Sequence, residues 1–299
     1  MTVKISKCYM YPLKSGAGVK VSSLELGKKG PKHDREWMLV KNGADDIKGR
    51  FITQRDKGCE KLALLQVFPQ SNGDMKFTLP NGKTLIVENE QLTQYEGLVS
   101  VWGDECEALE AGEEAAKFFS EFLGIECALV KMPEDFVRKT ESDFSKAGDH
   151  VSFADGFPLL ITNEASLTSL SEHFPSGEDV NMQRFRPNIV LTGIDAFEED
   201  VIHEVQIGDV VLEFVKPCSR CKITTIEQET ASIPSKEPLQ TLARVRRGKG
   251  GGIQGVFFGQ HAIPRVLGTV NVGDEVKILS KRKLHPALEN VVLKPKSSL

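Results

Sequence analysis

Two cysteines and an arginine lie close together in the stretch Lys216-Pro-Cys-Ser-Arg-Cys-Lys-Ile-Thr-Thr-Ile226. Upstream, apolar residues recur at Val210, Leu212 and Phe214, which predicts a buried strand. Downstream, the β-branched run Ile223-Thr-Thr-Ile226 predicts a second strand. The stretch therefore predicts two strands with a pair of thiols at their junction.

The spacing of Cys218 and Cys221 has three common uses. A structural zinc site would need a second Cys or His pair, but the other cysteines stand alone. A thioredoxin-like pair needs its first cysteine at the start of a helix, whereas a strand is predicted here. The third use is a thiolate offered to a ligand or metal, with Arg220 favouring the ionised form. Two reduced core cysteines beside a surface arginine are the alternative. The solitary cysteines are Cys8, Cys59, Cys106 and Cys127.

Length and charge limit the class of protein. The 299 residues suffice for two mid-sized domains or one large domain. A net charge of -4 argues against a broad nucleic-acid surface. No run of about 18 apolar residues predicts a membrane span. The first residues lack a signal-peptide core, and scattered cysteines suit a reducing compartment, so we expect free thiols and a cytoplasmic location.

Short strands dominate the predicted elements. An Asn81-Gly82 turn predicts a β-hairpin. Gly112 to Gly124, with acids in its first turn and phenylalanines on one side, predicts an amphipathic helix. Many short strands and few helices predict a mainly β, barrel-like architecture with peripheral helices, of the α+β class. The other expected elements are strands over 2–10, 19–26, 36–40, 99–108, 158–161, 188–193 and 205–215, helices over 163–173 and 238–246, a surface excursion over 132–151, a flexible basic loop over 246–252, and a last hairpin strand over 270–279.

Two polar stretches near the N-terminus are candidates for binding an anion. Lys14-Ser15 follows a proline in a glycine-rich turn, where backbone and side chains could hold a phosphate. Arg35 stands just ahead of a strand and could clamp an anion or pair with Asp34. A solvated turn lysine and a surface ion pair are the alternatives.

A third polar stretch, Arg184-Phe-Arg-Pro-Asn188, leads into a strongly apolar strand. The alternation with Phe185 predicts that both guanidinium groups lie on one face, next to free amide donors of Asn188. Such a set suits bidentate recognition of a phosphate or a heterocycle. A rim of charges at a barrel mouth is the alternative.

Seven motifs between residues 3 and 279 occur in the order found in one known family. They are Tyr11-Pro-Leu-Lys-Ser15, Asp34-Arg-Glu-Trp37, Glu164-Ala-Ser-Leu167, Arg184-Phe-Arg-Pro-Asn-Ile-Val190, Cys218-Ser-Arg-Cys221, Lys236-Glu-Pro-Leu239 and Phe258-Gly-Gln260. With them the chain resembles the MOSC family, named for the C-terminal domain of molybdenum cofactor sulfurase, and within it the YcbX-type and mitochondrial amidoxime-reducing proteins. The resemblance implies an N-terminal MOSC β-barrel domain over 1–125, a MOSC β-barrel domain over 126–280 and a C-terminal tail over 281–299.

The resemblance also implies a cofactor, a molybdenum pyranopterin (molybdopterin) held by its dithiolene sulfurs and one protein cysteine. By position in the motif, Cys221 would be the metal ligand and a catalytic residue, and Cys218 would be a wall residue. The resemblance also associates the family, though not this chain in particular, with pyridoxal phosphate binding and detoxification. The positions expected around the pterin and its phosphate are Lys14, Ser15, Arg35, Arg186, Asn188, Ser219 and Arg220.

By the same resemblance, the chain would be a molybdenum-dependent oxidoreductase that reduces a small N-hydroxylated substrate, R–NHOH, to R–NH2. His261 is the catalytic candidate for proton relay, because imidazoles titrate near neutral pH. Relatives carry small hydroxyl residues in place of Gly156-Phe157 and a tyrosine in place of His261, so the substrate here could differ. A cofactor-binding or sulfur-carrier module without turnover, or a metal-free ligand-binding barrel, is the alternative.

Electrons would have to come from a separate protein. The chain has no cysteine run for a plant-type ferredoxin cluster and no glycine-rich dinucleotide motif. We therefore expect a ferredoxin-, flavodoxin- or flavoprotein-type donor. The basic tail is either a docking patch for an acidic donor or a solvated, disordered terminus. Its cations are Lys281, Arg282, Lys283, Lys294 and Lys296.

Overall fold

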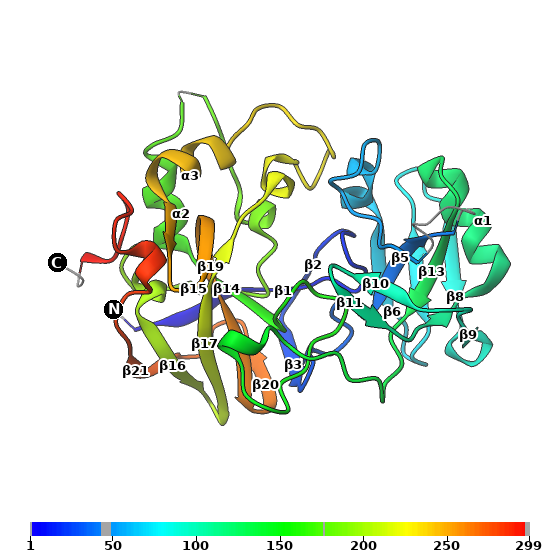
Figure 1. The fold of residues 1–299 in the computed structure, drawn as a ribbon, viewed down its shortest axis with the longest axis horizontal. Coiled ribbons are helices and arrows are strands. Elements are labelled where there is room, and N and C mark those ends of the chain that lie inside the picture. Colours follow the sequence, from blue (N-terminus) through cyan, green and yellow to red (C-terminus); the bar gives the residue numbers. More distant parts are fainter. Residues whose placement is uncertain (1, 43–48, 176, 297–299) are drawn as a thin grey trace.

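Two unequal halves lie side by side in the computed structural model, which describes residues 2–42, 49–175 and 177–296 (Figure 1). The larger half is built on one long sheet, and the smaller half on several short sheets and a helix. The fold is mainly β with peripheral helices, as predicted. No helix within these ranges is long and apolar enough to cross a membrane.

The sheet of the larger half runs in the order β2-β1-β15-β14-β19-β17-β16-β21, and β18 pairs with β19 beside this path. Only β14 and β15 among these neighbours pair in parallel within the described chain. Its strands are β1 (Lys4–Met10), β2 (Val19–Val21), β14 (Leu159–Asn163), β15 (Ile189–Thr192), β16 (Ile202–Ile207), β17 (Val210–Ser219), β18 (Arg247–Gly250), β19 (Ile253–Val266) and β21 (Lys277–Lys281).

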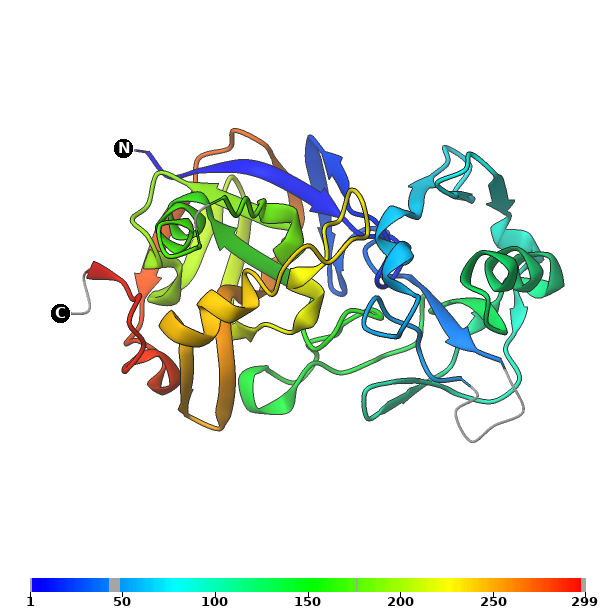
Figure 2. The same cartoon turned by 90° about the horizontal axis from the view of Figure 1, so that it is seen from above.

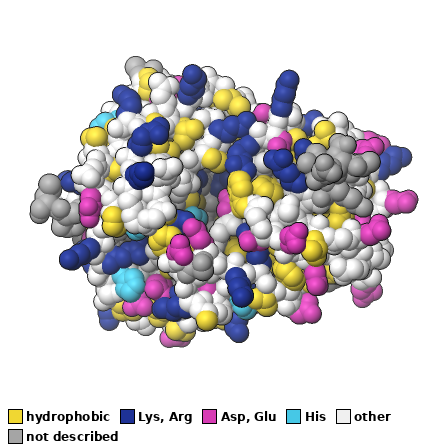
Figure 3. Space-filling model, viewed as in Figure 1, with side chains coloured by type: hydrophobic (Ala, Val, Ile, Leu, Met, Phe, Trp, Pro, Cys, Tyr) yellow, Lys and Arg dark blue, Asp and Glu magenta, His cyan; other side chains and the backbone are white. Residues whose placement is uncertain are grey.

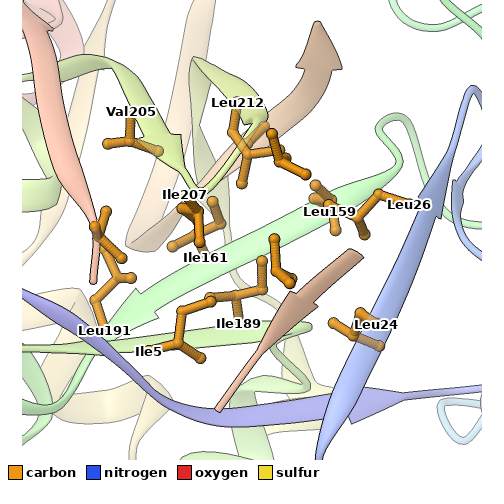
Figure 4. Close-up of a cluster of buried hydrophobic side chains, with 14 of the residues drawn as sticks. Ile5, Leu24, Leu26, Leu159, Ile161, Ile189, Leu191, Val205, Ile207 and Leu212 are labelled. Carbon is orange, nitrogen blue, oxygen red and sulfur yellow. The ribbon is translucent and has the colours of Figure 1, made fainter. Parts of the chain in front are cut away.

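An apolar core fills the inside of this curved sheet. Side chains two residues apart on a strand point to the same face, so Ile189 and Leu191 of β15 enter the core together. Figure 4 shows them meeting Ile5 of β1 and Ile161 of β14. On the other side, helices α2 (Glu164–Ser171) and α3 (Leu239–Val245) cover a second apolar cluster.

The smaller half pairs β5 (Trp37–Lys41) with β13 (Cys127–Lys131) and continues through β12 (Leu109–Glu110) to β9 (Thr93–Gln94). Helix α1 (Gly112–Leu123) packs its buried face, including Phe118 and Phe119, onto this half. Gly124 ends the helix with a φ of 74°, a left-handed conformation that glycine adopts without strain. The helix prediction is confirmed. The remaining strands of the smaller half are β6 (Gln66–Pro69), β7 (Met75–Thr78), β8 (Thr84–Val87), β10 (Val99–Val101) and β11 (Asp104–Cys106).

The halves exchange chain segments. Strands β1 and β2 come from the first residues but belong to the sheet of the larger half. Strand β3 (Ser23–Gly27) pairs with β4 (Gly30–Pro31) and with β20 (Gly268–Asn271) from the other end of the chain. Figure 2 shows both termini at the outer end of the larger half. The first strands of the chain pack in the larger half, so the two halves do not separate cleanly at residue 125. The domain boundary at residue 125 stays a prediction.

Three predicted elements are wrong. Residues 223–226 form no strand: a 3-10 turn spans Lys222–Thr225, and the hydroxyls of Thr224 and Thr225 donate to backbone carbonyls three residues back. The 246–252 run is not a flexible loop but contains β18, which closes a hairpin with β19. Residues 270–279 form no hairpin strand, because β20 and β21 pair in different sheets.

Two further predictions need correction in detail. Residues 99–108 contain two strands, β10 and β11, that form a hairpin around Trp102 and Gly103. The basic tail is not disordered over its described part. Ala287, Leu288 and Val291 pack on Phe257 of β19. The last three residues of the tail lie outside the described ranges.

Candidate functional site

A pocket of about 990 Å³ opens between the two halves. Figure 3 shows Lys and Arg side chains gathered along this hollow, next to hydrophobic side chains. The end of β17 forms one wall, and the β10–β11 turn and the segment 136–141 form others. The structure brings every predicted site residue to this pocket, while their roles in binding and catalysis stay predictions. They are Lys14, Ser15, Arg35, Arg186, Asn188, Ser219, Arg220, Cys221 and His261.

Positive charge dominates the pocket, although the whole chain is acidic. Its lining contains eight Lys and Arg residues against four Asp and Glu residues, whereas the chain carries a net charge of -4. A cavity lined mainly by one sign of charge focuses the field and attracts ligands of the opposite sign. The pocket is therefore suited to an anionic ligand.

Backbone strain also gathers at the pocket. Ser15, Arg35, Trp102 and Arg186 have φ values of 65°, 52°, 57° and 54°. These account for most of the positive φ values at non-glycine residues of the described chain. Such conformations cost about 1–3 kcal/mol each and persist only where the surrounding contacts impose them. Strain of this kind is typical of functional sites.

The two thiols differ sharply in environment. Cys221 is exposed and lines the pocket just after β17 ends, where its carbonyl accepts from the hydroxyl of Thr224. Cys218 is buried, and Arg220 Nη1 donates to its Sγ over 2.8 Å. Burial would raise the pKa of Cys218, but the charge of Arg220 and then that of His261 lower it to about 6. Cys218 is therefore mostly a thiolate at neutral pH.

The backbone around these thiols is held by its neighbours. Arg220 Nη2 donates to the carbonyl of Phe185, which ties the thiol segment to the turn before β15. A Cβ on Gly255 would lie 2.3 Å from the hydroxyl of Ser219, so a side chain there would displace this hydroxyl. The local path of residues 218–221 is thus set by two distant segments.

Tyr11 holds two of the predicted anion-binding arginines. The guanidinium carbons of Arg35 and Arg186 each lie 4.3 Å from the centre of its ring. Its hydroxyl donates to the carbonyl of Pro187, and the ring leaves no room for a side chain at Gly18. Burial lowers the pKa of Arg186 to about 10, which leaves it charged at neutral pH. Cation–π contacts with Tyr11 therefore hold two positive charges at one aromatic ring.

Asn188 anchors the pocket rather than offering free donors, which corrects the prediction for its amide. Its Nδ2 donates to the Tyr9 carbonyl and to Asp34 Oδ1, over 3.3 and 3.0 Å. Its Oδ1 accepts from the backbone of Leu160 and from Arg35 Nη1. Asp34 also pairs with Arg35, so this arginine is oriented by two buried partners.

Lys14 is buried and already paired. Its Nζ donates to the Phe153 carbonyl over 2.8 Å and to Asp155 Oδ1 over 2.7 Å. Burial lowers the pKa of Lys14, while Asp155 opposes that change. The surrounding protein would raise the pKa of Asp155, but the charge of Lys14 and its hydrogen bond lower it below its usual range. Trp102 Nε1 donates to the same carboxylate oxygen.

The prediction that Arg184 and Arg186 share one face is wrong. A 3-10 turn, Met182–Phe185, precedes Arg186, whose left-handed φ sends the two side chains apart. Arg184 is 1% exposed and pairs with Glu227 over 2.8 Å. Arg186 instead donates to the Gly16 carbonyl and lines the pocket. Arg184 is therefore structural.

His261 lies where β19 passes the pocket. Its ring lies against Phe157, with ring centres 5.0 Å apart, so the two departures noted in the sequence are in contact. Its partner strand β17 carries Cys218, and His261 lies opposite Lys216 of that strand. The imidazole is close enough to the thiol for its charge to help lower the pKa of Cys218.

Three residues that shape the site had no assigned role in the sequence, and a fourth, Asp34, was expected only as an ion-pair partner of Arg35, a pair that the structure contains. Asp155 lies 141 positions from the lysine it pairs with, and no local pattern marks such a contact. Trp102 lies in a predicted strand that proves to be a hairpin turn. Tyr11 and Asp34 stand in the resemblance motifs beside Lys14 and Arg35, and membership of those motifs was the available signal.

The fold and the pocket define a two-part β protein with a cation-rich cavity beside a pair of thiols. The chain matches the family model of the MOSC N-terminal beta barrel domain over residues 2–126 and that of the MOSC domain over residues 148–277. It therefore belongs to the MOSC family, in the branch with the N-terminal β-barrel domain.

Named relatives resemble most of the chain. Human mitochondrial amidoxime reducing component 2 is 33% identical over 251 residues, which cover 81% of this chain and 72% of that protein. Human component 1 is 31% identical, with coverage of 93% and 83%. Molybdenum cofactor sulfurase of Oryza sativa subsp. japonica is 27% identical and covers 86% of this chain but 32% of its own length.

Among solved structures, the YuaD protein of Bacillus subtilis is 10% identical and covers 92% of this chain and 94% of that one, with a TM-score of 0.43. YiiM of Geobacillus stearothermophilus is 15% identical and covers 42% and 55%, with a TM-score of 0.28. Similarity at this level carries no functional argument.

Proposed function

We propose that this protein is a molybdenum-cofactor-dependent reductase of small N-hydroxylated compounds. The reaction consumes two electrons and two protons and converts R–NHOH to R–NH2 and water. One observation carries the proposal: the exposed thiol of Cys221 lines a cation-rich pocket in a chain whose family relatives include amidoxime-reducing components.

The residues present fit an anionic heterocyclic cofactor. Within the described chain, Nη2 of Arg186, Nε of Arg220 and Nδ1 of His261 are buried, lack a hydrogen-bond partner and belong to pocket residues. Buried donors without partners are costly, and a bound polar ligand would satisfy them. A group with phosphate and pterin acceptors suits these donors.

The metal-binding capacity of the pocket fits the same cofactor. No group of three or more His, Cys, Asp or Glu side chains in the described ranges could hold an ion by itself. A metal at Cys221 would therefore take most of its ligands from an organic cofactor, and soft sulfur ligands suit molybdenum of this kind. When bound, the cofactor would supply the two-electron couple.

The chain's own residues would bind the cofactor and handle protons. Arg35, Arg186 and Arg220 would pair with its anionic groups, with Lys14, Ser15, Asn188 and Ser219 completing the wall. His261, which lines the pocket and helps to lower the pKa of Cys218, would pass a proton to the departing hydroxyl. The Tyr11 and Asp34 contacts would keep the arginines in place without reorganisation.

Electrons would come from a separate ferredoxin-, flavodoxin- or flavoprotein-type partner, since the relatives act as components of a reducing system by name. A cytoplasmic location stays a prediction, because the relatives are named as mitochondrial. The associations with pyridoxal phosphate and detoxification also stay predictions.

A second candidate is a cofactor-binding or sulfur-carrier module without reductase turnover. The similarity to the rice molybdenum cofactor sulfurase favours it. That candidate predicts bound molybdenum but no reduction of any N-hydroxylated substrate.

One experiment separates the two candidates. The protein is produced in a host that makes the cofactor, its molybdenum is measured by elemental analysis, and benzamidoxime reduction is followed with reduced methyl viologen. Bound molybdenum with turnover supports the reductase. Bound molybdenum without turnover supports the carrier, and a protein without molybdenum contradicts both.

A further inference from the structure

Trp102 lies at the edge of the pocket, in the turn between β10 and β11. Trp102 is 52% exposed. Val137, which lines the same pocket, is 48% exposed. An exposed apolar patch rimmed by polar residues is typical of a ligand-binding groove. Together they form an apolar rim beside the cations of the pocket.

The indole is held in place at the expense of backbone strain. Trp102 has a φ of 57°, a left-handed conformation that bulky residues rarely adopt. The neighbouring Gly103 could carry a positive φ without strain, yet the strain falls on the tryptophan. Strain retained at a bulky residue on a pocket rim points to a function for its side chain.

Three contacts from two segments of the chain fix the ring. Its Nε1 donates to Asp155 Oδ1 over 3.1 Å, the carboxylate that also pairs with Lys14. The guanidinium carbon of Arg55 lies 4.4 Å from the ring centre, and the Phe51 ring meets it in a T-shaped arrangement with ring centres 5.2 Å apart. Half of the residue stays exposed and it lines the pocket, so part of its aromatic surface is open to a ligand there.

We propose that Trp102 is a specificity-determining residue, against which the organic group of the substrate packs. The proposal rests on the proposed function and concerns the part of the substrate that does not react. A flat aromatic group gains area burial and favourable stacking on the indole, whereas a small aliphatic group gains little of either. The rim therefore favours N-hydroxylated substrates whose nitrogen group is attached to an aromatic ring.

The test compares benzamidoxime with acetamidoxime, which share the reacting group and differ in the organic group. Wild type, Trp102→Leu, Trp102→Phe and the control Leu98→Ala are assayed with reduced methyl viologen. Leu98 is 50% exposed near the same hairpin but does not line the pocket. The readout is the ratio of kcat/KM for the two substrates, so that any loss of cofactor cancels.

We expect Trp102→Leu to lower this ratio by about threefold to tenfold, Trp102→Phe to restore most of it, and Leu98→Ala to leave it unchanged. An unchanged ratio in Trp102→Leu, or an equal fall in Leu98→Ala, would overturn the proposal. Equilibrium dialysis of both amidoximes, without reductant, repeats the comparison without turnover. Wild type could reduce neither compound while Trp102→Leu still loses the selective binding of benzamidoxime. That result would contradict the proposed function but support the role of Trp102 in binding the organic group.

Discussion

Arg220 Nη1 lies 2.8 Å from the Sγ of Cys218, so a guanidinium donates to a buried thiol in the wall of the pocket. The same arginine donates through Nη2 to the carbonyl of Phe185 and keeps Nε without a partner in the described chain. One side chain thus ionises a thiol, ties two segments together and leaves a donor for a ligand.

Replacing this arginine should change the ionisation of Cys218. Arg220→Gln removes the positive charge that lowers the pKa of Cys218 to about 6, so this pKa should rise toward 9. Thiolate absorbance is titrated in protein made without the cofactor, with Lys222→Gln as the matched control on an exposed cation. Because the folded-state pKa is depressed, the ion pair stabilises the fold at high pH and this stability is lost as pH falls through about 6. An unshifted titration in Arg220→Gln would show that another group ionises the thiol.

The two cysteines should separate in their effect on the metal. Cys221→Ser should abolish activity and change the molybdenum spectrum, because a hard hydroxyl replaces the exposed soft thiolate. Cys218→Ser should retain the metal. Elemental analysis, the molybdenum spectrum and the activity of both variants provide the measurement, and the opposite pattern would reverse the assignment of the ligand.

Pocket cations should matter more than surface cations for cofactor occupancy. Arg186→Ala and Lys14→Ala each remove a buried positive charge, and we expect at least a tenfold loss of affinity for the cofactor, about 1.4 kcal/mol or more. Lys249→Ala is the control, since Lys249 is exposed on β18 and lies outside the pocket. Molybdenum per protein and the fluorescence of released pterin are measured. Equal losses in all three variants would contradict the role assigned to the pocket.

Glu199 should make stability depend on pH. It is 0% exposed, and burial, followed by the charge of Asp200, raises its pKa. A carboxyl with a raised pKa binds more protons in the folded state, so stability is full below its ordinary value of 4.5 and falls as pH rises through the raised value. Glu199→Gln should therefore reduce the difference in unfolding free energy between pH 6 and pH 8 by about 1 kcal/mol. Urea unfolding at both pH values checks this.

The matched control for that variant is Glu90→Gln, which changes an exposed carboxylate. The control should retain the pH dependence of wild type. A pH dependence that survives in Glu199→Gln would assign it to other groups.

Nicotinamide alone should not support turnover. These 299 residues contain neither the cysteine run of a plant-type ferredoxin cluster nor a glycine-rich dinucleotide motif. Purified holo-protein should reduce benzamidoxime with reduced viologen and stay inactive with NADPH or NADH. Steady NADPH oxidation without an added protein would refute the need for a separate donor.

Patterns within a few residues were sufficient for much of the fold. Strand β17 follows from apolar residues at every second position, and helix α1 follows from its periodicity and from Gly124 at its end. Both depend on interactions between near neighbours, and those are present in the sequence itself. The β-branched run after Cys221 failed as a strand predictor because hydroxyls of threonine can bond to the local backbone instead.

The chemistry of the site was also partly local. The Cys-x-x-Cys spacing, the neighbouring Arg220 and the runs of cations marked the residues that line the pocket. The sequence by itself thus determined which kinds of groups the site contains and which family the chain resembles.

Tertiary structure alone decided how those groups are used. Cys218 and Cys221 are three residues apart, yet only folding buries the first and exposes the second. Arg184 and Arg186 diverge because the backbone at Arg186 is left-handed, a conformation imposed by contacts with distant segments. Lys14 pairs with Asp155 across 141 positions, and only chain packing brings them within 2.7 Å. Burial and long-range pairing decide whether a side chain is charged, what its pKa is and where it points. Neither burial nor long-range pairing can be read from a short stretch of residues.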